Sequence, residues 1–134
     1  MATKMTLQER LVGNLKMDLD YTDSRIAKFM EIFAADPAYA FEWSHDYFDV
    51  AATKKVVSTV QHGLDRRLEK DATLTDEQVV EFCVEWAKEL TERAMDEARC
   101  PSRSSSMQSN LMAQSLMAKR LDIAQKLERI AKSV

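Results

Sequence analysis

Two patterns in this chain combine residue types that perform chemistry in other proteins. The first is Glu42-Trp-Ser-His45, because Glu-x-x-His on a helix places a carboxylate and an imidazole on one face. Di-iron sites in helical bundles use this pair twice, together with two further glutamates. Here the pair occurs once, and Thr59 precedes the only other histidine, His62, by three residues. The sequence therefore predicts no metal site. Glu42 and His45 are expected to have surface or helix-end roles.

The second pattern is a stripe of five carboxylates, which we call the acid stripe. On a helix they fall within about a quarter turn of one another: Glu81, Glu85, Glu89, Glu92 and Asp96. The stripe is similar to the carboxylates that all-helical nucleotide pyrophosphohydrolases of the MazG kind place on facing helices, but the paired acidic motif on a second helix is absent. We expect either a solvated face, partly neutralised by Lys88 and Arg93, or a docking surface for a basic partner, because aligned charges steer association.

The last quarter of the chain has the opposite charge. Residues 1–99 hold 13 Lys and Arg against 20 Asp and Glu, a net charge of −7, whereas residues 100–134 hold 6 against 2, a net charge of +4. Lys and Arg can contact a nucleic-acid backbone without reading bases, although aromatic residues for base stacking are absent from this segment. This predicts an alternative contact with RNA or single-stranded DNA through Arg103, Lys119, Arg120, Lys126, Arg129 and Lys132.

Several classes of enzyme are excluded by missing signatures. The chain has no Gly-rich phosphate loop, no Gly-x-Ser-x-Gly elbow and no His-Glu-x-x-His. Cys83 and Cys100 form neither a disulfide framework nor a Cys-x-x-Cys spacing, so we expect two reduced thiols. No cofactor, catalytic residue or metal ligand is predicted. An enzyme ranks third among the functions considered, either metal-dependent through Glu42 and His45 or hydrolytic at the acid stripe.

The elements that position these residues are predicted to be helices. Only two Gly and two Pro occur in 134 residues, which disfavours sheet folds with many tight turns. We expect an all-α single domain over residues 1–134, an antiparallel bundle of four long helices with a short aromatic-rich helix or turn near residues 37–44. Residues 1–5 are expected to be a flexible N-terminus, and residues 101–106 a Ser-rich connection to the last helix.

Local signals mark the helix ends. Thr6 and Glu9, and likewise Thr75 and Gln78, have the spacing of capping boxes. One helix over about residues 7–35 is slightly favoured over two that meet near residues 21–22, and Pro37 disfavours helical geometry at the residue before it. Asp36 is expected to cap the short helix and Ser44 the long helix that follows.

Apolar residues recur at helical spacing and predict which faces are buried. In the helix that carries the acid stripe they centre on Trp86: Val79, Phe82, Cys83, Trp86, Ala87, Leu90 and Ala94. In the last helix they form a seam: Met112, Leu116, Ile123, Leu127, Ile130 and Val134. The aromatic segment is expected either to close one end of the bundle or to anchor a partner: Tyr39, Phe41, Trp43, Tyr47 and Phe48.

Together these features favour a protein that works by binding. We expect a non-enzymatic adaptor, small regulator or inhibitor, or complex subunit that docks on a larger macromolecular assembly through the acid stripe and through Met112 and Met117, whose flexible side chains suit adaptable surfaces. In size and class the chain is similar to the small helical subunits of multisubunit CRISPR effector complexes, which implies the nucleic-acid alternative. Self-association is a further expectation. No apolar run reaches the ~18 residues of a membrane span, so a cytoplasmic protein is predicted.

Overall fold

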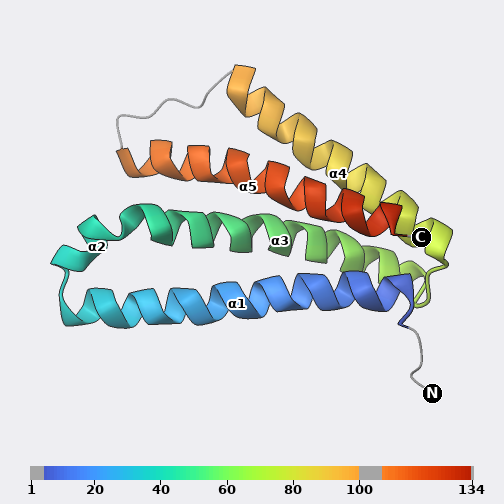
Figure 1. The fold of residues 1–134 in the computed structure, drawn as a ribbon, viewed down its shortest axis with the longest axis horizontal. Coiled ribbons are helices and arrows are strands. Elements are labelled where there is room, and N and C mark those ends of the chain that lie inside the picture. Colours follow the sequence, from blue (N-terminus) through green and yellow to red (C-terminus); the bar gives the residue numbers. More distant parts are fainter. Residues whose placement is uncertain (1–4, 100–106, 134) are drawn as a thin grey trace.

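The fold is an all-α bundle of four long helices and one short one (Figure 1). The computed structural model describes residues 5–99 and 107–133, and this part of the chain contains no strand. The helices are α1 (Leu7–Ala35), α2 (Ala38–Glu42), α3 (Ser44–Lys70), α4 (Asp76–Arg99) and α5 (Met107–Lys132). Consecutive long helices run in opposite directions, which confirms the predicted antiparallel bundle. Residues 1–4 and the Ser-rich connection at 101–106 lie outside the described residues.

Both predicted capping boxes are present and fix where two helices begin. At α1, the Thr6 hydroxyl accepts from the backbone N–H of Glu9 at 3.1 Å, and the Glu9 carboxylate accepts from the backbone N–H of Thr6 at 3.4 Å. At α4, the backbone N–H of Thr75 donates to the Gln78 side chain at 2.9 Å, and the Thr75 hydroxyl accepts from the backbone N–H of Gln78 at 3.2 Å. Each box satisfies two amides near a helix start.

The first long helix is continuous, as favoured, and ends before Pro37. The Asp36 carboxylate accepts from the backbone N–H of Ala38 at 3.0 Å, so its side chain caps the first amide of α2, although the N-cap position itself belongs to Pro37. The prediction that Ser44 caps α3 was wrong, because Ser44 is already the first residue of that helix. The N-cap position belongs to Trp43, whose side chain makes no capping hydrogen bond. The chain turns from α2 into α3 too tightly for a separate capping residue.

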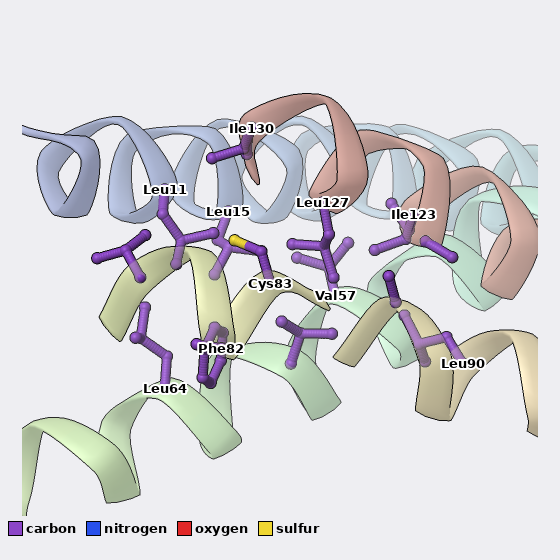
Figure 2. Packing of buried hydrophobic residues seen from close by; sticks show 14 of the residues in the cluster. Leu11, Leu15, Val57, Leu64, Phe82, Cys83, Leu90, Ile123, Leu127 and Ile130 are labelled. Atoms are coloured by element: carbon purple, nitrogen blue, oxygen red, sulfur yellow. The ribbon is translucent and has the colours of Figure 1, made fainter. Parts of the chain in front are cut away.

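The core is built by all four long helices (Figure 2). Leu11 and Leu15 of α1 point toward side chains of α3 and α4, and Ile123 and Leu127 of α5 lie in the same cluster. Burial removes apolar surface from water, which is the main favourable term in folding. The fully buried members with the largest side chains are Leu11, Leu64, Leu90, Leu127, Val57, Val60 and Val79.

Two predicted core faces need correction in detail. Trp86 was placed at the middle of the buried face of α4, but it is only half-buried and packs at the margin of the core. The seam of α5 is buried at Ile123, Leu127 and Ile130 and only half-buried at Met112 and Leu116. Val134 lies outside the described residues. The core is therefore tightest where the C-terminal half of α5 meets α1, α3 and α4.

Gly63 explains how Trp86 reaches its position. A Cβ atom built on Gly63 would lie 2.5 Å from Cζ2 of the Trp86 indole, whereas one built on Gly13 would meet nothing within 4 Å. The indole thus packs directly on the backbone of α3, at a distance that leaves no room for a side chain. A glycine in a helix interior lowers stability relative to alanine, and here it permits the close approach of the Trp86 indole to α3.

The buried thiol of Cys83 makes stability depend on pH. Cys83 is fully buried in the core, and burial raises its pKa from 9.0 to about 11. The fold favours the neutral thiol. The stability that this preference contributes is therefore fully present below the pKa of the unfolded state and is lost as pH rises toward the pKa of the folded state. Between about pH 8 and about pH 10, the free energy of unfolding is expected to fall by about 1 kcal/mol more for wild type than for Cys83→Ala.

Urea unfolding of both proteins at the two pH values measures this difference. The variant keeps every tyrosine and lysine that also titrates at high pH, so subtraction isolates the thiol. Equal pH dependence in the two proteins would show that the Cys83 thiolate is tolerated in the core.

Candidate binding surfaces

The acid stripe lies on the outer side of α4. In the view of Figure 1, α4 is at the edge of the bundle beyond α5, against which it packs most extensively. Four of the five carboxylates are exposed and Glu89 is half-buried. Glu89 accepts from Nε of Arg93 at 2.9 Å, and Asp96 lies 4.0 Å from Arg99. Glu81, Glu85 and Glu92 form no ion pair with another described residue, so the stripe presents net negative charge to solvent.

Two exposed apolar side chains border the acid stripe. Val84 is 52% exposed and Met95 is 49% exposed. They are eleven residues apart, which is about three helical turns, and so they lie on nearly the same side of α4. Each follows a stripe glutamate by three residues, one turn along the helix. The outer face of α4 therefore combines negative charge with apolar contact area, a feature that the sequence pattern alone did not identify.

The predicted methionine surface of α5 is divided. Met112 and Met117 are both half-buried. Because they are five residues apart, their side chains leave the helix about 140° apart. Met112 belongs to the apolar seam of α5 and Met117 lies beside it, so the two side chains do not form one patch.

The structure brings half of the predicted basic set together. Lys119, Lys126 and Arg129 line a groove of about 320 Å³ whose walls come from α1, α3 and α5. The others do not line it: Arg120 is half-buried, Lys132 is exposed three residues beyond Arg129 near the end of α5, and Arg103 lies outside the described residues. The groove, which we call the α1–α5 groove, continues toward Ile130 and the start of α1 as a second space of about 270 Å³.

Residues of α1 complete the groove, and sequence reasoning missed them. Tyr21, which is 61% exposed, lines the first part together with Lys126 and Arg129. Arg10 lines the second part with Arg129. Arg10 and Tyr21 are eleven residues apart, a spacing that places them on one side of a helix. However, it gave no sign that this side faces α5, which is distant in sequence.

Ion pairs neutralise the carboxylates of the groove. Nζ of Lys126 contacts the Asp18 carboxylate at 3.2 Å, across the groove from α5 to α1. Nζ of Lys119 lies 3.8 Å from the Asp122 carboxylate. Arg10 and Arg129 form no ion pair within residues 5–99 and 107–133. The groove thus carries two compensated lysines and two guanidinium groups whose charge is uncompensated.

Glu42 and His45 do not form a ligand pair. Glu42 ends α2 and His45 lies in the first turn of α3, so the pair straddles a helix boundary. Nδ1 of the exposed His45 is 3.7 Å from the Asp49 carboxylate, which also accepts a hydrogen bond from the Ser115 hydroxyl at 2.9 Å. This contact ties α3 to α5. The described residues include no group of three or more His, Cys, Asp or Glu side chains suited to hold a metal ion.

The aromatic segment is partly packed in the bundle and partly exposed. Tyr47 packs edge-on against Phe29 and Phe33 of α1, with ring centroids 6.0 and 5.9 Å away, and also contacts Phe48. These rings close the end of the bundle where α1 ends and α3 begins. Tyr39 and Trp43 are 43% and 44% exposed. The side chain of Phe41 lies outside the described residues.

Comparisons with known proteins give no further information on the site. No protein-family model, no curated protein sequence and no solved structure matches this chain. Among the described residues, none of the helices has both the length and the apolar character needed to cross a bilayer. Functional conclusions therefore rest on the surfaces of the molecule.

Proposed function

We propose that this protein is a non-enzymatic helical subunit or adaptor that docks on a larger macromolecular assembly through the outer face of α4. The observation that carries the proposal is the exposure of four acid-stripe carboxylates along one helix at the edge of the bundle. Carboxylates aligned in this way create a negative field that attracts a positively charged partner and fixes its register.

The exposed apolar side chains beside the acid stripe define the partner further. Single exposed hydrophobic residues are ordinary on a protein surface. Val84 and Met95, however, lie on one side of α4 next to the carboxylates, and a methionine adapts its shape to different contacts. The surface suits a basic protein segment that also carries apolar residues. A second contact with the assembly through Met112 and Met117 remains a prediction.

Charge reversal on α4 tests the proposal. The double variant Glu85→Lys and Glu92→Lys is expected to recover roughly tenfold less of the partner than wild type in affinity capture from cells that make the protein. The estimate assumes that two exposed ion pairs, each contributing up to ~1 kcal/mol, are lost. Quantitative mass spectrometry of the captured proteins provides the measurement. Neither Glu85 nor Glu92 forms an ion pair with another described residue.

A matched control separates docking from the overall change in charge. Glu31→Lys and Glu128→Lys introduce the same charge change on exposed positions of α1 and α5. A genuine partner is recovered with this control and with wild type, and is lost with the α4 variant. Equal recovery with all three proteins would contradict docking through the acid stripe.

A further inference from the structure

The α1–α5 groove has the features of a site for an extended anion. Arg10 and Arg129 line the same 270 Å³ space, and neither forms an ion pair with a carboxylate of the described residues. Guanidinium groups bind phosphate or carboxylate oxygens through paired N–H donors. The carboxylates of Asp18 and Asp122 also line the groove, but they form ion pairs with Lys126 and Lys119 and not with the two arginines.

An exposed tyrosine ring indicates which kind of anion the groove suits. Tyr21 lines the other part of the groove, which also includes Arg129, and 61% of its surface is exposed. Tyr21 lies eleven residues beyond Arg10 on α1, a distance of about 16 Å along the helix. Proteins that bind single strands combine a cationic groove for the backbone with aromatic side chains on which bases stack. A carboxylate-rich protein segment would make no comparable use of the ring.

We propose that the α1–α5 groove binds a single-stranded nucleic acid, with Arg10 and Arg129 on backbone phosphates and Tyr21 stacked against a base. The contact is independent of base sequence, because phosphates and ring faces occur in every nucleotide. The proposal extends beyond docking through α4. The described walls of the groove come from α1, α3 and α5, so loss of one binding activity leaves the other intact.

Fluorescence anisotropy with labelled oligo-deoxythymidine and oligo-uridine of about 16 nucleotides tests the proposal. Wild type is expected to bind one or both strands, more weakly at about 200 mM than at about 50 mM salt. Arg10→Ala with Arg129→Ala should reduce the slope of log affinity against log salt by about 1.4, the value for two lost contacts to single-stranded phosphate. Tyr21→Ala should reduce affinity roughly tenfold, and Tyr21→Phe should retain it because the ring is kept.

The control is Lys16→Ala with Arg66→Ala, which removes two exposed cations outside the groove. Its affinity and salt slope should equal those of wild type, and circular dichroism should show all variants folded. Absence of binding at low salt would overturn the proposal. An equal loss of affinity in the control would also overturn it. If poly-glutamate competes with the oligonucleotide and Tyr21→Ala has no effect, the groove binds an acidic protein and the proposal is wrong.

Discussion

Gly63→Ala is expected to lower the free energy of unfolding by about 1–3 kcal/mol, the range for overpacking a well-packed contact. Alanine is normally the better helix former. Here its methyl group would overlap the Trp86 indole, which lies 2.5 Å from the position of the new Cβ atom. The indole also lies 6.3 Å from the Phe82 ring and 6.0 Å from the Arg93 guanidinium, so its withdrawal would disturb both contacts.

Gly13→Ala is the matched control, since nothing lies within 4 Å of the Cβ atom that it adds. This substitution should raise stability by about 1 kcal/mol, the difference in helix propensity between the two residues. Urea denaturation followed by circular dichroism measures both variants. If Gly63→Ala stabilises the protein as much as Gly13→Ala does, the close packing of Trp86 on α3 is wrong.

Leu127→Ala is expected to lower the free energy of unfolding by about 2–5 kcal/mol, the cost of a large-to-small change in a core that cannot collapse onto the cavity. Leu127 is only 1% exposed and lies where α5 meets the other three long helices. Leu121→Ala removes the same atoms from the same helix at a position that is 39% exposed. It should change stability by less than about 1 kcal/mol. Similar losses in the two variants, measured by urea denaturation, would contradict the placement of α5 in the bundle.

Much of the fold follows from local sequence signals. Capping boxes at Thr6 and Thr75 and the proline at position 37 act within one turn of chain, so they place three helix ends without knowledge of the rest of the molecule. Apolar spacing likewise indicates which faces are buried. Local signals failed at Ser44, because the geometry of a tight turn between two helices depends on how those helices pack in the bundle.

The candidate surfaces were predictable only in part. Carboxylates on one helix share a face whatever surrounds it, so the acid stripe could be recognised from spacing. The α1–α5 groove joins Arg10 and Tyr21 to Arg129, which is more than one hundred residues later in the chain. Such a pairing depends on which helices become neighbours in the bundle. The position of Trp86 depends in the same way on a glycine in the preceding helix.

Carboxylate labelling of the protein within its native assembly tests docking through α4 most directly. A carbodiimide reagent modifies exposed Asp and Glu side chains, and mass spectrometry compares each site in the assembly with the same site in the isolated protein. We predict lower modification of Glu81, Glu85, Glu92 and Asp96 in the assembly, with unchanged modification of Glu31 and Glu128. Equal modification of the four α4 carboxylates in both states would contradict the proposal.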